Sequence, residues 1–304
     1  GALEDRTLLS AQPNLSLSVP AETFIGEQFG MSVTFDNTSL TDVGYGPYVT
    51  LIVPARGADG PYVGVPPNLT ADGIRYVGGT ATFLGSPITP IVNQFFTGVG
   101  PTASISFQIP GSIVGKTITG TVGDQLLVFQ LPFGSFAPDQ PPATINLTMQ
   151  GSNFADLGTP LTFTAGGGFI FGNDPLDNAP PNGGDPDIVD STPAIATNTP
   201  VLAKLAKTYV GPENETATGP NFPRQYVVTL DVATGQTLTN VHLRDFLPNN
   251  VQFISASVVG NGTTLVTDLG TPSTSTPGGN VLRLLNTVVG TAAAADATLT
   301  IDFY

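Results

Sequence analysis

The sequence predicts an all-β fold, built as tandem β-sandwich modules, from its composition, its hydrophobic periodicity and its turn residues. Of 304 residues, 36 are Gly and 28 are Pro, while charged residues make up only 11%. Such a chain is poor in helix formers and rich in residues that favour strands and turns. Apolar and polar residues alternate in short segments along the whole chain, and Gly, Pro, Asn or Asp bounds most of them. This pattern is typical of strands with one buried face.

The first predicted module spans residues 1–172 and holds eight or more strands. The strand candidates are Leu15–Val19, Met31–Phe35, Tyr48–Val53, Gly73–Val77, Thr80–Leu84, Ser104–Ile109, Gln125–Phe129, Thr144–Met149 and Leu161–Ala165. This number exceeds that of a minimal immunoglobulin-like sandwich, so we expect long inserted loops.

Residues 173–200 differ from their surroundings, because Pro, Asp, Asn and Gly dominate them. A segment of this composition buries too little apolar area to form a core. We therefore expect a linker, a long loop or a hinge that a cation orders.

The second predicted module spans residues 201–304. Its strand candidates are Val201–Val210, Arg224–Val232, Thr239–Phe246, Val251–Val259, Asn280–Leu285 and Ala297–Phe303, with Thr264–Asp268 as a weaker one. Six or seven strands in about 100 residues are typical of a single immunoglobulin-like sandwich.

A short match between the two modules suggests an internal repeat. Val33-Thr-Phe-Asp-Asn leads through a polar turn to a strand that ends at Pro54, and Val228-Thr-Leu-Asp-Val leads similarly to Pro248. Two related sandwiches in tandem would explain the match, and chance similarity between two strand–loop–strand units is the alternative.

The second module also resembles a known family. The matching segments are Leu205-Ala-Lys207, Tyr226-Val-Val-Thr-Leu, Leu238-Thr-Asn-Val, Leu243-Arg-Asp-Phe-Leu-Pro248 and Val251-Gln-Phe253. This pattern resembles the conserved-repeat domains of prokaryotic surface proteins (domain of unknown function 11), although Ala233-Thr-Gly235 stands where members commonly have Asn-Thr-Gly. The first module looks like a more distant relative, through Phe35-Asp-Asn-Thr and Gly44-Tyr-Gly-Pro47. The resemblance implies immunoglobulin-like sandwiches in a cell-surface or secreted bacterial protein, usually in arrays and without chemical activity.

The charge of the chain excludes some function classes. Its net charge is −14, with nine basic and 23 acidic residues, so it lacks the basic footprint of nucleic-acid binding.

The chain has no Cys, which excludes thiolate zinc sites and thiol chemistry. No apolar run is long enough for a membrane span. Since the sequence starts at Gly1 and ends within a strand pattern, we expect it to be part of a longer protein.

Enzyme chemistry is not expected, because no nucleophile elbow, phosphate loop or zinc-protease helix is found. The one histidine, His242, alternates with Leu243 and shares a strand face with Arg244, so we expect it to be solvated.

Calcium is the cofactor that the sequence favours most. Five aspartates crowd the segment between the modules: Asp174, Asp177, Asp185, Asp187 and Asp190. Hard carboxylate oxygens on a loop suit calcium, which takes six to eight of them. The alternative is a solvated acidic linker, since Asp, Asn, Pro and Gly are also ordinary loop residues.

Two further predictions concern the second module. Some bacterial adhesin sandwiches that resemble this one carry isopeptide cross-links, and Lys204 or Lys207 on the first strand could face an Asn or Asp on the last, such as Asp302. Lys207 is equally explained as a surface residue whose stem lies along apolar surface. Ala297–Phe303, if terminal and at an edge, could pair with a neighbouring chain by strand addition.

Three functions follow from these observations. The preferred one is a structural or adhesive extracellular module, a spacer or a subunit of a fibre or layer, whose partners are other copies, neighbouring domains or a surface receptor. The second is a calcium-dependent module that binds a glycan or a protein. The third is a non-catalytic appendage of a secreted hydrolase.

Overall fold

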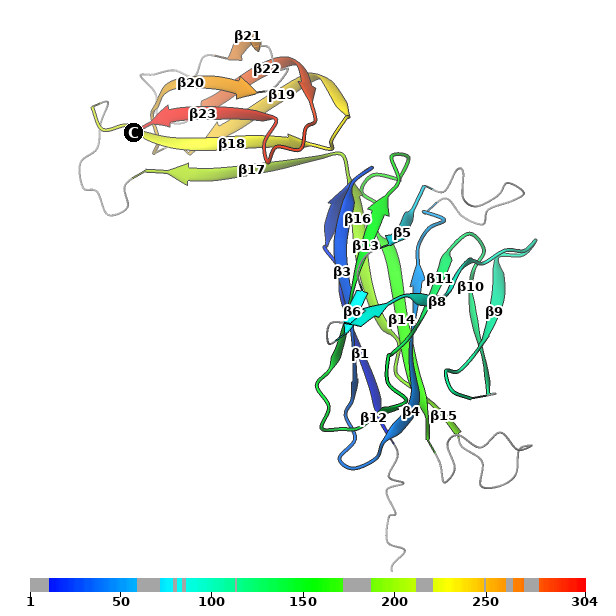
Figure 1. The fold of residues 1–304 in the computed structure, drawn as a ribbon. Helices are drawn as coiled ribbons and strands as arrows, with labels where there is room; N and C mark the ends of the chain where they lie inside the picture. The colour runs from blue at the N-terminus through cyan, green and yellow to red at the C-terminus, as the bar shows by residue number, and fades with distance from the viewer. Residues whose placement is uncertain are drawn as a thin grey trace, which may run out of the picture. The chain divides into compact units, whose positions relative to one another are not determined.

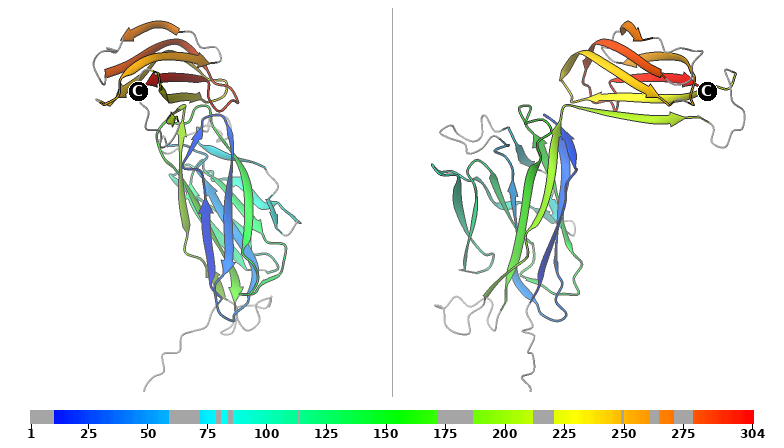
Figure 2. Two further views of the ribbon diagram at one scale, coloured as in Figure 1. Left: turned by 90° about the vertical axis from the view of Figure 1, so that its left-hand side faces the viewer. Right: turned by 180° about the vertical axis from the view of Figure 1, so that it is seen from behind.

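The computed structural model describes residues 11–58, 72–78, 81–83, 86–112, 114–171, 187–211, 221–248, 250–260, 265–270 and 279–304. The chain divides into two compact units, Gly1–Pro200 and Val201–Tyr304. Within the described ranges every regular element is a strand (Figures 1 and 2), which confirms the all-β prediction. Accordingly, none of the described residues belongs to a helix that could cross a membrane.

The first unit contains sixteen strands among its described residues. They are β1 (Pro13–Ser18), β2 (Glu22–Phe24), β3 (Gln28–Asn37), β4 (Gly44–Val53), β5 (Ile74–Gly78), β6 (Ala81–Phe83), β7 (Ser86–Ile88), β8 (Pro90–Phe95), β9 (Thr102–Gln108), β10 (Gly115–Thr121), β11 (Gln125–Gln130), β12 (Ser135–Phe136), β13 (Ala143–Gly151), β14 (Leu161–Phe171), β15 (Asp187–Asp190) and β16 (Ala194–Val201).

Two sheets form the sandwich of this unit. One has the strand order β1-β3-β13-β5, and the other has the order β2-β16-β14-β4-β11-β8, with β12 pairing β4 and β15 pairing β14. Their facing sides share one core, in which Val33, Phe35 and Ile145 of the smaller sheet pack with Leu51 and Phe163 of the larger one. All five side chains are fully buried. The strict alternation that predicted half-buried strands follows from this packing.

A third layer covers part of the outer face of the larger sheet (Figure 1). The hairpin of β9 and β10 lies there, and Phe107 and Ile105 from β9 pack with Leu126 and Val128 of β11 and Tyr48 of β4. Strands β4 and β11 are therefore buried on both faces. This is why 48–53 is nearly continuously apolar in the sequence instead of alternating.

The predicted linker at 173–200 is wrong over its second half. Residues 187–190 form β15, and 194–201 form β16, which pairs with β14 along Leu161–Ala165. Asn198 is fully buried in β16, where its side chain accepts a hydrogen bond from Thr23 Oγ1 and donates one to the Pro20 carbonyl. The polar composition of this segment did not indicate a strand, because the residue at its core position is the hydrogen-bonded Asn198 and not an apolar one. Residues 172–186 lie outside the described part.

The second unit begins at the residue where the sequence placed the second module. Its strands are β17 (Ala203–Val210), β18 (Arg224–Val232), β19 (Thr237–Leu247), β20 (Phe253–Gly260), β21 (Leu265–Gly270), β22 (Gly279–Val289) and β23 (Ala297–Phe303). They form a four-stranded sheet, β17-β18-β23-β20, over a three-stranded sheet, β19-β22-β21. Alternate residues of β18 and β23 enclose a core with Leu243, Leu285 and Val288. This is the predicted immunoglobulin-like sandwich.

The last strand is not an edge, so the predicted strand addition at Ala297–Phe303 is wrong. β23 pairs with β18 on one side and with β20 on the other. The chain returns to the centre of the sheet, as Greek-key connections do, and both backbone edges of the strand are occupied.

The two units share one seven-strand topology. The first unit has the sheets β1-β3-β13-β5 and β4-β11-β8, and the second has β17-β18-β23-β20 and β19-β22-β21. If these seven strands are numbered along the chain in each unit, both units have the sheet orders 1-2-7-4 and 3-6-5. The repeat suggested by the sequence falls on equivalent strands, β3–β4 and β18–β19. Among the described strands, the first unit adds β2, β14 and β16 on the free side of β4.

Candidate functional site

Asp190 is the one predicted calcium ligand whose side chain the structure describes. Its Oδ1 accepts a hydrogen bond from the Tyr48 hydroxyl at 2.7 Å, and its Oδ2 pairs with Lys116 Nζ. Burial, and after it the contact with Asp190, raises the pKa of Tyr48 far above its usual value. The carboxylate therefore ties together β15, β4 and the β9–β10 hairpin. Lys116 and Tyr48 lie too far from Asp190 in sequence for this network to have been predicted.

The other four aspartates give no geometry for a metal site. Asp174, Asp177 and Asp185 lie outside the described residues, and only the backbone of Asp187 is described, at the start of β15. Within the described ranges no three His, Cys, Asp or Glu side chains gather as a metal site would require. Calcium binding by this segment stays a prediction.

Lys207 makes a contact in the second unit that the sequence did not predict. Its Nζ lies 2.8 Å from Asp245 Oδ1 on the opposite sheet and 4.0 Å from the centroid of the Tyr226 ring. The Asp245 side chain is only 9% exposed, and its Oδ2 is buried without a hydrogen-bond partner in the described structure. A buried carboxylate of this kind needs the lysine, because an uncompensated charge in the interior is strongly destabilising.

The predicted cross-link to Asp302 is wrong. Lys207 stands opposite Val228, which faces the core, whereas Asp302 stands opposite Gln225 on the outer face of the same sheet. Lys204 is on the outer face but opposite Asp231, at the other end of β18 from Gln225. Asp302 instead accepts hydrogen bonds from Gln225 Nε2 and Ser255 Oγ.

His242 is exposed on β19 together with Arg244, while Leu243 between them is buried. This confirms the predicted solvated strand histidine.

Three buried polar side chains hold loops to strands. Asn37 is 1% exposed and donates from Nδ2 to the carbonyls of Asp42 and Phe136, while its Oδ1 accepts from the backbone N–H of Gln12 and Ser39. Asp296 is fully buried, and its carboxylate accepts from the N–H groups of Val232 and Thr291 and from Thr291 Oγ1. Asn198 acts likewise in β16. Each satisfies backbone groups that would otherwise be buried without partners.

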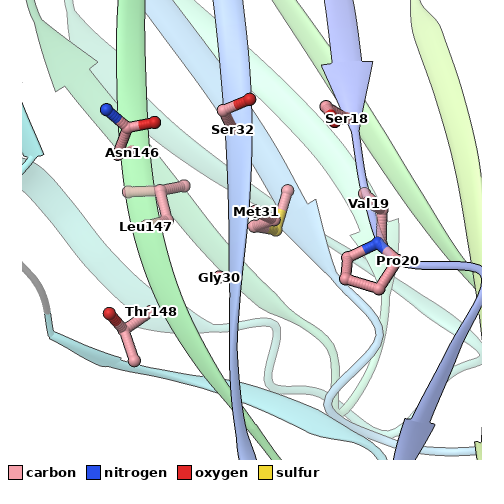
Figure 3. Close-up of a pocket in the computed structure, with 9 residues that line it drawn as sticks. All are labelled: Ser18, Val19, Pro20, Gly30, Met31, Ser32, Asn146, Leu147 and Thr148. Carbon is pink, nitrogen blue, oxygen red and sulfur yellow. The ribbon is translucent and has the colours of Figure 1, made fainter.

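A shallow groove of about 550 Å³ lies across β1, β3 and β13 (Figure 3). Ser18, Ser32 and Asn146 stand opposite one another in register, on the face turned away from the core. Gly30 lies beside them, and a Cβ added there would have no other atom within 4 Å, so the groove is open at this point. The groove is lined by uncharged groups, namely hydroxyls, an amide and the apolar residues Val19, Pro20, Met31 and Leu147.

A second cleft, of about 630 Å³, is lined by residues of β5, β8, β11 and β13 and of the loop after β13. Gln125 is buried at its base, where its Oε1 accepts from Tyr76 N and its Nε2 donates to Asn93 Oδ1. Arg75 and the 81% exposed Phe154 also line it. Amides beside an exposed aromatic ring can bind a neutral polar ligand.

Comparisons with known proteins give similarities of fold only. No family model matches the sequence, and no curated protein matches it either. The solved structures that resemble it include AvmM, which catalyzes macrocyclization in alchivemycin A biosynthesis, with a TM-score of 0.30, 11% identity, and 63% of this chain and 90% of that one covered.

Two others are a cohesin and a pilin subunit. The sixth cohesin from scaffoldin B of Acetivibrio cellulolyticus, in complex with a dockerin, has a TM-score of 0.29 and 13% identity, with 62% of this chain and 99% of that one covered. BcpA, the major pilin subunit of Bacillus cereus, has a TM-score of 0.28 and 9% identity, with 95% of this chain and 55% of that one covered. Similarities this distant do not bear on function.

Proposed function

We propose that this chain is a non-catalytic structural or adhesive module of a large extracellular surface protein, acting as a spacer or as a component of a fibre or layer. The proposal rests mainly on the buried polar side chains, which make their hydrogen bonds to other parts of the fold. Asn37, Asn198 and Asp296 each bind several groups of the fold itself. A chain whose buried polar groups fasten loops to strands is built for a stable shape.

The shared topology of the two units supports the same role. Two sandwiches with one strand order, one after the other, are what a protein built from repeated modules contains. The sequence resemblance to conserved-repeat domains of surface proteins agrees with this arrangement and motivates the proposed extracellular location.

Proteolytic shaving of intact producing cells tests the proposal. Peptides from residues 1–304 should be released from intact cells by added trypsin and identified by mass spectrometry. Peptides that are released only after lysis would contradict a surface location.

The second candidate is a calcium-dependent module that binds a glycan or a protein. The acidic segment that contains Asp185 and Asp187 motivates the metal, and the amide-lined cleft beside Asn93 motivates the ligand. A third candidate, an appendage of a secreted hydrolase, predicts a catalytic domain next to this segment in the full-length gene.

Calorimetry with and without calcium separates the first two candidates. A ligand that binds only the folded state raises the melting temperature. The structural proposal predicts equal melting temperatures in excess calcium and in a chelator such as EGTA. A higher melting temperature in calcium would favour the second candidate.

A further inference from the structure

In the first unit, a strand beside β4 covers the first strand of the facing sheet. β14 pairs with the free side of β4 and packs against β1. Leu15 of β1 is only 8% exposed, and a Cβ built on Gly167 of β14 would lie 3.2 Å from its Cδ1. Leu161, Phe163 and Ala165, alternate residues of β14, are buried in the same core.

The second unit has the same seven strands, but nothing described takes the place of β14. β19, the equivalent of β4, pairs with β22 alone among the strands that the structure describes. β17, the equivalent of β1, is the edge strand of its sheet (Figure 1), and no described strand packs on it as β14 packs on β1.

The side chains of β17 show the consequence. Leu205 and Tyr209 stand opposite Leu230 and Tyr226, which face the core, so they too point to the inner side of the sheet. Leu205 is nevertheless 64% exposed and Tyr209 38% exposed. Lys207 lies between them and reaches Asp245 on β19, at the margin of the core. Inward-pointing apolar side chains left in water beside an unpaired strand edge form a site that an added strand can complete.

The charges of the chain indicate what this edge attracts. The three strands around it have an excess of positive charge, with four of the nine Lys and Arg residues (Lys204, Lys207, Arg224 and Arg244) against two acidic residues (Asp231 and Asp245). Residues 1–200 instead hold sixteen of the 23 acidic residues and only four basic ones. The first unit of another copy is therefore an electrostatically complementary partner for this edge.

We propose that the free edge of β19 accepts an extended segment of a second copy of this chain, which pairs with β19 and covers Leu205 and Tyr209. The added strand takes the place that β14 has in the first unit, with alternate apolar residues turned toward β17. Because the accepting edge and the donated segment are different surfaces, the contact is heterologous and can continue into an open chain of subunits. This inference rests on the structural role proposed above and names its partner.

Sedimentation velocity of the full chain, from about 1 to 100 µM, tests the proposal. The wild-type chain should form larger species as its concentration rises, and 0.5 M salt should weaken the association because it screens the charges. Leu205→Lys places a charge in the uncovered space and should weaken association by about tenfold or more. Val259→Lys is the matched control, since Val259 is 73% exposed on β20, at the other side of the same sheet.

Both substitutions are at exposed positions, and thermal unfolding by circular dichroism checks that both variants stay folded. A wild-type chain that remains monomeric across the whole range would overturn the proposal. Equal association of the Leu205→Lys and Val259→Lys variants would also overturn it, because association would then use another surface. Neither result would touch the surface location that proteolytic shaving measures, so the two proposals fail separately.

Discussion

At the scale of single residues, the stability of this protein depends on a few buried polar groups. Asp296 alone receives three hydrogen bonds, at 2.9, 2.9 and 2.7 Å, which join the start of β23 to the end of β18 and to the loop after β22. Hydrogen bonds to a charged group are about twice as strong as those between neutral groups. No local sequence pattern marks Asp296, because its partners Val232 and Thr291 lie on two separate segments of the chain.

Replacing Asp296 should destabilise the second unit strongly. Asp296→Ala leaves the N–H groups of Val232 and Thr291 without acceptors and should lower the free energy of unfolding by about 3–5 kcal/mol. Urea unfolding followed by circular dichroism measures this change. Asp302→Ala, which removes a partly exposed carboxylate on β23, the strand that begins directly after Asp296, should cost under about 1 kcal/mol. Equal losses in the two variants would contradict the role given to Asp296.

Asp124 gives the first unit a pH-dependent stability. Burial raises its pKa to about 6, against an opposing hydrogen bond from the Arg56 backbone N–H. The folded state thus holds this proton more tightly than the unfolded state, so the stabilising contribution is present below about pH 4 and is lost as the pH rises through about 6.

Asp124→Asn keeps the acceptor oxygen and removes this dependence. The variant should be more stable than the wild type at pH 7, by about 1–3 kcal/mol, and the difference should shrink toward zero near pH 4. Urea unfolding of both proteins at the two pH values provides the measurement. An advantage that is the same at both values would show that Asp124 does not titrate as described.

At the scale of elements, the sequence predicted strands well wherever one or both faces are apolar. Arg224–Val232 and Ala297–Phe303 have the predicted bounds, because their buried residues alternate without interruption. β10 was missed, since its Thr-rich outer face pairs Thr117 and Thr119 with serines of β9 and it contributes only Ile118 to the apolar cluster. The position of β23 in the sheet could not be predicted either, because strand order depends on long-range pairing that periodicity does not encode.

Gly44, at the start of β4, is required by the packing of the two sheets. A Cβ at this position would overlap the Phe169 ring of β14, and that ring is itself fully buried against Phe35. Gly44→Ala should therefore lower the free energy of unfolding by about 1–3 kcal/mol or more. Gly30→Ala is the control, because a Cβ added at Gly30 meets nothing within 4 Å and alanine suits a strand better than glycine. Similar thermal unfolding of the two variants would show that the contact with Phe169 does not constrain the fold.

At the scale of the whole molecule, the two units differ in charge and in completeness. Both contain the same seven-strand topology, but in the described structure only the first has additional strands, β14 followed by β16 and β2, on the free side of β4. The sequence revealed the second module and its family resemblance, and it suggested the repeat. It could not reveal the uncovered edge, because Leu205 and Leu15 have the same alternating context and differ only in what packs on them.

A structural or adhesive module of a surface protein must lie on the outside of the cell. Immunogold electron microscopy with antibodies against residues 1–304 tests it most directly, on intact and on permeabilised producing cells. Gold particles are expected on the outside of intact cells, on the surface layer or on fibres that extend from it. Label that is found only inside permeabilised cells would contradict it.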